Sequence, residues 1–229
     1  MKKIVFDSGP IISLATNNLL NTLPDLKKQF KGQFCITESV REELVDRPFE
    51  IKRFKFEAFQ IEALIESGVL DVVHTDNLRK LSLEVLNIAN SIYQVNKTNP
   101  QLIQLGEIET LVYAVEENAS AVVMDERSTR MIVESPNSLK RILEKRLHKR
   151  VDINQKALKD FKARINNIPI LRSAELMSIA YEKGMLDKFL VNIPKARQNL
   201  LDAVLWGLKL NGCAISPPEI DAIMKLYSK

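Results

Sequence analysis

Residues 105–130, LGEIETLVYAVEENASAVVMDERSTR, contain the pattern that decides the fold. Gly106 is a natural break before a helix, and the apolar residues that follow it recur at helical spacing as far as Asn118. Residues 120–124 are then a short apolar run with the length and branching of a buried strand, and this run ends on Asp125. A helix, a tight turn and a strand make half of a βαβ unit, and open α/β sheets bind ligands at the carboxyl ends of their strands. Asp125 is therefore expected at a ligand-binding edge.

The start of the chain has a similar arrangement. Residues 2–6 read as a buried strand that ends at Asp7, and Ser8-Gly9-Pro10 predicts a turn into an apolar helix. Short apolar runs at residues 33–36 and 69–73 predict two more strands, with helical spacing between the runs. Strands that alternate with helices predict an α/β fold with a mainly parallel sheet.

Length and composition limit the class of protein. A chain of 229 residues forms one domain, or one domain and a smaller appendage. No apolar run approaches the roughly 20 residues that span a bilayer, and charged residues occur too early in the chain for a secretion signal. We therefore expect a cytoplasmic protein that does not contact membranes.

The net charge of +4 permits a polyanionic partner without demanding one. Cys35 and Cys213 stand in apolar surroundings and are expected as reduced core thiols.

The last third of the chain predicts helices alone. Beyond Asp152, residues 171–181 and 194–210 are apolar at helical spacing, and Ser216-Pro-Pro-Glu219 is a capping signature for a final helix. We predict a domain over residues 1–150 and a helical extension over residues 151–229, with a soft boundary around residues 152–168. Such an extension suits a lid, a dimerisation surface or a partner-binding part.

Three acidic residues stand at strand or helix ends, namely Asp7, Glu107 and Asp125. They meet at one edge of the sheet if the first strand is adjacent to the strand that precedes Asp125. Carboxylates that close repel, and a divalent cation removes this conflict: Mg²⁺ or Mn²⁺ binds a few carboxylates plus waters and leaves positions for a phosphate oxygen. The plainer alternatives are that Asp7 and Asp125 cap the helices that follow them, and that Glu107 favours the positive end of its own helix.

In order and spacing these segments resemble the PIN-domain ribonucleases. IVFDSGPIISLA is similar to the family's first motif, and ITESVREEL is similar to its Val-x-x-Glu-Leu pattern, which selects Glu43 over Glu42. GEIETLVYA looks like the GExEA-type branch, although Glu107 stands where Asp is commoner in the family. The resemblance covers residues 1–142 and implies a three-layer α/β/α fold with a central, mainly parallel sheet.

The resemblance also implies an activity and a set of site residues. It implies an endoribonuclease that hydrolyses RNA phosphodiester bonds with one or two Mg²⁺ or Mn²⁺ ions. The implied catalytic residues and metal ligands are Asp7, Glu43, Glu107 and Asp125. Glu109 is a rival of Glu107 but points about 200° around the helix from it, and Glu126 is a weaker candidate. Many relatives are toxins with an antitoxin partner, others process RNA, and dimers are common, so an antitoxin and a homodimer are implied without being selected.

Further residues are expected to contact the RNA. Ser8 could hydrogen-bond a carboxylate or a metal-bound water, and Arg127 or Arg130 could hold a substrate phosphate. Between Ser138 and Asn167, ten lysines and arginines face three acids, which predicts a basic stripe for the RNA backbone or an ordinary solvated helix face. The stripe residues proposed for RNA are Lys145, Arg146, Lys149 and Arg150. The competing function is a non-catalytic RNA-binding or protein-interaction module with the same fold.

Overall fold

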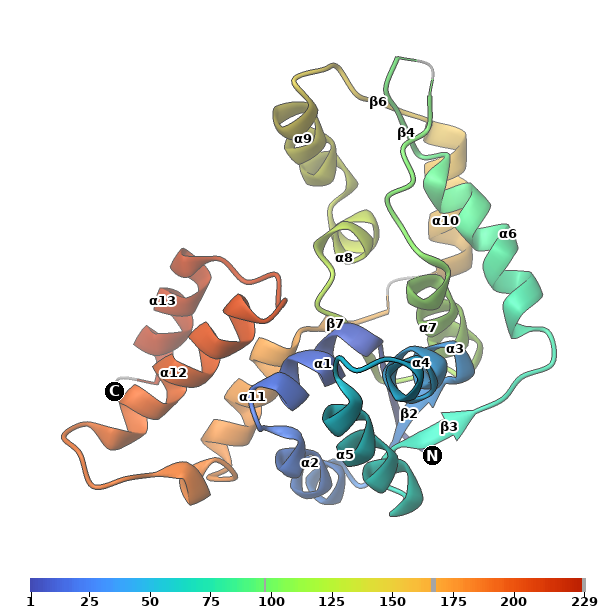
Figure 1. Ribbon diagram of the computed structural model, residues 1–229. Coiled ribbons are helices and arrows are strands. Elements are labelled where there is room, and N and C mark those ends of the chain that lie inside the picture. Colours follow the sequence, from blue (N-terminus) through green and yellow to red (C-terminus); the bar gives the residue numbers. More distant parts are fainter. Residues whose placement is uncertain (97, 166–167, 228–229) are drawn as a thin grey trace.

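The computed structural model describes residues 1–96, 98–165 and 168–227, and within them five strands form a parallel sheet in the order β3-β2-β1-β5-β7 (Figure 1). The central strand β1 pairs with β5, with Phe6 opposite Val123, so the condition under which Asp7 and Asp125 meet at one edge is fulfilled. The sheet strands are β1 (Lys3–Phe6), β2 (Gln33–Thr37), β3 (Asp71–Val73), β5 (Ala121–Val123) and β7 (Ile170–Leu171).

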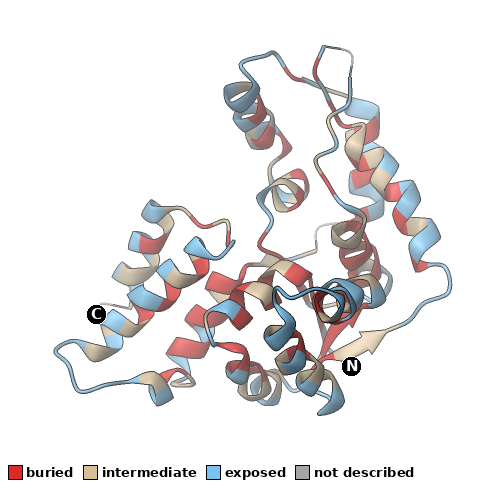
Figure 2. Cartoon of the chain, viewed as in Figure 1, coloured by how far each residue is buried: buried red, intermediate tan, exposed pale blue. Residues whose placement is uncertain are grey.

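Helices cover both faces of the sheet, so the predicted three-layer α/β/α architecture is confirmed. Ile4 and Phe6 of β1 pack into one hydrophobic cluster and Val5 packs into the other, because side chains alternate along a strand. Figure 2 shows the buried strands enclosed by helices whose outer faces are exposed. The first layer contains α1 (Ser8–Thr16), α2 (Leu23–Phe30), α5 (Lys55–Glu66), α11 (Ser173–Glu182), α12 (Ala196–Leu210) and α13 (Pro217–Leu226). The second contains α6 (Leu78–Asn90), α7 (Leu105–Glu116), α8 (Arg127–Glu134), α9 (Pro136–Leu147) and α10 (Gln155–Ile165).

The segment after β2 is helical but irregular. It runs through α3 (Glu38–Arg41), a π-helical stretch η2 (Glu42–Asp46) and α4 (Arg47–Glu50). The N-cap of α3 is Thr37, whose hydroxyl accepts from the Val40 amide at 3.4 Å. Short 3₁₀ turns, η1 (Leu20–Thr22) and η3 (Asp187–Phe189), complete the connections.

The prediction that the chain is wholly helical beyond Asp152 is wrong in two places. β6 (Asp152–Ile153) pairs antiparallel with β4 (Tyr93–Gln94), and β7 joins β5 at the edge of the central sheet. Strands of two residues show no periodicity in a sequence, so tertiary pairing alone reveals them. The division into residues 1–150 and 151–229 stays a prediction, although the second part supplies β7 to the sheet. Asn166 and Asn167, inside the predicted boundary, lie outside the described residues.

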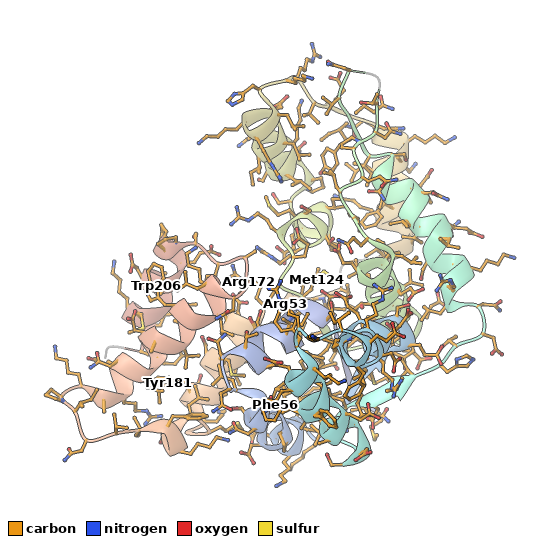
Figure 3. The ribbon with its side chains drawn as sticks, in the orientation of Figure 1. Arg53, Phe56, Met124, Arg172, Tyr181 and Trp206 are labelled. Carbon is orange, nitrogen blue, oxygen red and sulfur yellow. The ribbon has the colours of Figure 1, made fainter. Side chains whose placement is uncertain are left out.

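The C-terminal helices are tied to the sheet by Arg172, which directly follows β7. This buried guanidinium donates to the Glu219 carboxylate of α13 at 2.8 Å and to the Ala214 carbonyl at 3.1 Å, and it also pairs with Glu175. Figure 3 shows Arg172 near Met124 at the sheet, with the labelled Tyr181 and Trp206 farther out on α11 and α12.

Two expectations from composition can be compared with the fold. Cys35 and Cys213 are buried free thiols, as predicted, and burial raises the pKa of both. Within the described residues, no helix is both long and apolar enough to cross a membrane.

Candidate functional site

A cleft of about 220 Å³ opens at the carboxyl edge of the sheet, where β1 and β5 end. Its walls come from α1, η2, the first turn of α7 and the loop that follows α12. The cleft is lined by all of the acids predicted as catalytic: Asp7, Glu43, Glu107 and Asp125. The fold therefore brings to one place residues that are spread over more than a hundred positions.

Asp7 directly follows β1 and is 5 % exposed. Its backbone amide continues the sheet by donating to the Val123 carbonyl at 3.0 Å, which fixes where the side chain begins. Asp7 occupies the N-cap position of α1, although its side chain makes no capping hydrogen bond of ordinary geometry. Burial raises the pKa of Asp7 to about 7, and the nearby Glu43 and Asp125 carboxylates add to the rise while the amides of Ser8 and Gly9 oppose it.

Gly9 lies beside both strand-end acids. A Cβ atom at this position would lie 3.5 Å from an Asp7 carboxylate oxygen and 3.8 Å from the Asp125 Cβ, which are ordinary van der Waals contacts.

Asp125 is 2 % exposed and is held by three donors. The Ser173 amide donates to Oδ1 at 2.8 Å, while the Ser173 hydroxyl and the Ser13 hydroxyl donate to Oδ2 at 2.7 Å and 3.1 Å. The sequence reasoning missed both serines. Ser13 carried a weak signal, a buried polar residue in an apolar helix, but nothing in the sequence relates Ser173 to an acid 48 positions away.

The choice between Glu107 and Glu109 is visible in the structure. Glu107 lines the cleft, and its carboxylate accepts a hydrogen bond from the Thr129 hydroxyl of α8. Burial raises the pKa of Glu107 to about 7, with the Thr129 hydrogen bond opposing the rise and the Asp7 charge adding to it. Glu109 does not line this cleft and instead faces a pocket beside α3. Their different directions follow from the 200° that separates helix positions two apart.

The remaining acids have distinct surroundings. Glu43 lies in the π-helical segment η2 with its side chain exposed at the cleft, and such segments are frequent at functional sites. Its neighbour Glu42 faces the other pocket and pairs with Arg47 at 3.5 Å. Glu126 also lines the cleft, but its carboxylate caps α8 by accepting from the Ser128 amide at 3.0 Å. The weaker metal candidate therefore already has a structural role.

The residues predicted to contact RNA are not all at the cleft. Ser8 lines it and is buried, whereas Arg127 is exposed at the start of α8. Arg130 pairs with Glu134 at 3.0 Å, and its buried Nε has no hydrogen-bond partner among the described residues. The predicted stripe residues Lys145, Arg146, Lys149 and Arg150 are exposed at the end of α9 and in the loop after it, which Figure 1 shows beyond α8 from the sheet.

Whether a divalent ion suits these residues can be tested on their chemistry. In the described part of the chain, no three Asp, Glu, His or Cys side chains are arranged closely enough to hold a metal ion. Mg²⁺, however, binds through one or two carboxylates and keeps several waters, and Asp7 and Glu107 supply two oxygen donors in one cleft. Because burial disfavours the charged form of both acids, a cation would relieve an existing cost. The donor set fits a hard divalent ion.

A family described as a PIN domain matches residues 3–138, more than half of the chain. The chain belongs to the PIN-domain family. No curated protein and no solved structure matches it significantly. PIN domains are generally nucleases and typically use divalent metal ions, which agrees with the activity class implied by the sequence. The matched span of this PIN domain contains the four acids predicted as catalytic but ends before β7 and Ser173, and assignment to the GExEA-type branch stays a prediction.

Proposed function

We propose that this PIN domain is an endoribonuclease that hydrolyses RNA phosphodiester bonds with Mg²⁺ or Mn²⁺. One observation carries the proposal: Asp7 and Glu107 are withdrawn from solvent yet face one cleft together with Glu43 and Asp125. Burying acids in this way costs free energy in the absence of a cation. Such a cost is typical of functional sites rather than of structural ion pairs.

Each acid has a part in the proposed mechanism that follows from its surroundings. Asp7 and Glu107 would hold the ion, which when bound lowers the pKa of a water and neutralises charge on the phosphate. Asp125 is held by Ser13 and Ser173, so its carboxylate would stand at a fixed position beside the ion in the cleft. Glu43 is exposed and unconstrained by a hydrogen bond among the described residues, so its carboxylate is available to accept a proton from the attacking water.

Cleavage of single-stranded RNA with Mn²⁺ or Mg²⁺, and with EDTA as the blank, tests this proposal. Asp7→Asn should reduce the rate by about 100-fold or more, because the ion loses a ligand while the side chain keeps its size. Mn²⁺ should raise the melting temperature of the wild type and not that of Asp7→Asn, since a ligand stabilises only the state that binds it. Glu43→Gln against Glu42→Gln is a matched pair on η2, and only the first should slow cleavage.

Two results would contradict the proposal. Near-wild-type cleavage by Asp7→Asn would show that the acids are misassigned. A wild type with neither cleavage nor a Mn²⁺ shift, but with retained RNA binding, would favour the non-catalytic module. Asp125→Asn is less informative, because an amide cannot accept all three of the hydrogen bonds that the carboxylate accepts.

From the composition we also propose that the protein is cytoplasmic. On the resemblance alone we propose that it forms a homodimer and acts either as a toxin controlled by an antitoxin or as an RNA-processing enzyme. Growth arrest on expression of the wild type but not of Asp7→Asn would support the toxin role. Light scattering on the purified chain measures the oligomeric state.

A further inference from the structure

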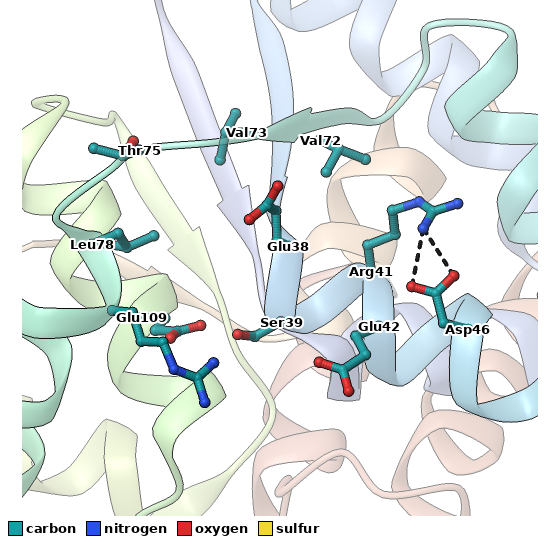
Figure 4. Close-up of a pocket in the computed structure, with 11 residues that line it drawn as sticks. Glu38, Ser39, Arg41, Glu42, Asp46, Val72, Val73, Thr75, Leu78 and Glu109 are labelled. Atoms are coloured by element: carbon teal, nitrogen blue, oxygen red, sulfur yellow. Dashed lines mark hydrogen bonds and ion pairs between the residues drawn. The ribbon is translucent and has the colours of Figure 1, made fainter.

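A second pocket, of about 450 Å³, lies beside α7 and away from the acidic cleft (Figure 4). One wall comes from α3 and η2, and the other from the end of β3 and the first turns of α6 and α7. Figure 4 shows Glu109 on the α7 side, with Glu42 and Asp46 across from it. Its volume lies in the range of small-ligand sites.

Glu109 is the unusual residue of this pocket. It is 3 % exposed, yet its carboxylate has no hydrogen bond or ion pair with any described residue. Arg172 shows the usual arrangement in this protein, since that buried charge has carboxylate partners on two helices. The Glu109 carboxylate is therefore accessible from the pocket alone, and a cationic group that enters the pocket could pair with it.

The arginines around the pocket do not neutralise Glu109. Arg41 is already bound to Asp46 at 2.8 Å and to Glu62 at 3.3 Å. Arg79 also lines the pocket, but it is exposed and forms no ion pair with any residue that the structure describes. Of the other three carboxylates that line the pocket, Asp46 is paired with Arg41, Glu42 with Arg47 and Glu38 with His74. Glu109 is therefore the one lining carboxylate without an ion pair among the described residues, and it favours a cation over a phosphate group.

We propose that this pocket binds a guanidinium or primary ammonium group on an aliphatic stem, with Glu109 as the carboxylate that receives it. Charge-assisted hydrogen bonds between such a group and a carboxylate are among the strong ones. Val72, Val73 and Leu78 form an apolar wall along which the methylene stem can lie. Both a free amine and an arginine or lysine side chain of a polypeptide have this chemistry.

The test measures binding of two probes to the full chain at low salt by titration calorimetry. The probes are agmatine and a short peptide with blocked termini that contains one arginine. Both should bind the wild type, and Glu109→Gln should weaken binding by about tenfold or more because the buried charge partner is lost. Glu116→Gln is the matched control, since it makes the same change at an exposed position near the end of the same helix and should bind as the wild type does.

The outcomes separate the sources of the ligand. Tighter binding of the peptide than of agmatine assigns a polypeptide side chain, and the reverse assigns a free amine. Equal binding by Glu109→Gln and wild type would overturn the proposal, as would the absence of binding to the wild type. Binding of the probes to Arg79→Ala but not to the wild type would also overturn the proposal, because Arg79 itself would then be the group that occupies the pocket. A thermal melt of Glu109→Gln at or above that of the wild type checks that this variant is folded.

This proposal does not depend on the ribonuclease. The binding test uses no RNA, no metal ion and no variant of a residue that lines the acidic cleft. Failure of either proposal therefore leaves the other intact.

Discussion

At the scale of single residues, Asp7 and Glu107 connect the site to stability. Both have a pKa of about 7 in the folded protein, above their ordinary values of 3.8 and 4.5, chiefly because burial disfavours the charged form. At a pH between the ordinary pKa and the folded-state pKa of each acid, the folded state binds a proton that the unfolded state has lost. Without metal, the free energy of unfolding should therefore fall as pH rises from about 4 to about 7 and then level off.

The first prediction follows from this sign. In EDTA, the wild type should be less stable at pH 8 than at pH 5, with a slope of up to about 1.4 kcal/mol per pH unit for each of the two acids. Asp7→Asn should flatten the slope, whereas Asp202→Asn, the same change at an exposed position on α12, should not. Urea unfolding at pH 5, 6, 7 and 8 measures it. If the free energy of unfolding depends on pH in the same way in Asp7→Asn and in the wild type, the Asp7 carboxyl is ionised over this whole pH range.

Ser173 carries the second prediction. Ser173→Ala removes the hydroxyl that donates to Asp125 and should cost about 1 kcal/mol of stability, and it should slow RNA cleavage by about tenfold because Asp125 is less firmly placed. Ser178→Ala on the same helix is the control, since the Ser178 hydroxyl bonds only to the Ala174 carbonyl one turn earlier. If Ser173→Ala and Ser178→Ala cleave RNA at equal rates and are equally stable, Ser173 does not contribute to the site.

At the scale of secondary-structure elements, β7 and α11 connect the C-terminal helices to the cleft. Arg172 binds α13 through Glu219, and Ser173 binds Asp125 at the end of β5. Burial opposes ionisation of Glu219, but its bonds to Ser216 and Arg172 outweigh this and lower its pKa to about 2. The C-terminal segment therefore supports the position of Asp125, one of the acids predicted as catalytic.

The third prediction tests this support. Arg172→Met should lower the free energy of unfolding by about 2 kcal/mol or more, because it leaves two partly buried carboxylates without their partner. Lys183→Met removes an exposed ion pair at the other end of α11 and should change stability by less than about 1 kcal/mol. Chemical unfolding of both variants supplies the comparison, and similar small losses would show that α13 is held mainly by apolar packing.

At the scale of the whole molecule, the charges at the end of α9 extend beyond the cleft. Lys145, Arg146 and Lys149 are exposed and have no ion pair among the described residues, whereas Arg150 pairs with Asp152 at 3.1 Å. An RNA that reached them from the cleft would be held by its backbone rather than by its bases.

The fourth prediction concerns these residues. Replacing Lys145, Arg146, Lys149 and Arg150 together by Glu should weaken RNA binding and reduce its dependence on salt, because fewer counterions are released. The same replacement of Lys52, Arg53 and Lys55, which are exposed near α5, should have a smaller effect. Fluorescence anisotropy with labelled single-stranded RNA at several salt concentrations measures both. Unchanged RNA binding would show that the end of α9 is an ordinary solvated surface.

Much of the fold could be predicted because its determinants are local. The apolar runs before Asp7 and Asp125 became β1 and β5, and the capping pair of Ser216 with Glu219 is present in α13. The helical direction that separates Glu107 from Glu109 follows from the helix period alone. Such features depend on neighbours a few residues apart, so a single sequence contains them.

The remaining features depend on contacts between distant residues. By itself the sequence determined the alternating strands and helices and the placement of Asp7 and Asp125 at the ends of two strands, while the pairing of β1 with β5 that brings these acids together came from the tertiary structure. Only the tertiary structure decided that β7 completes the sheet, that Ser13 and Ser173 hold Asp125, and that Glu109 is buried without a partner in a second pocket. The physical reason is that hydrogen-bond partners and burial are set when distant segments pack, and no local period or spacing encodes which segments meet.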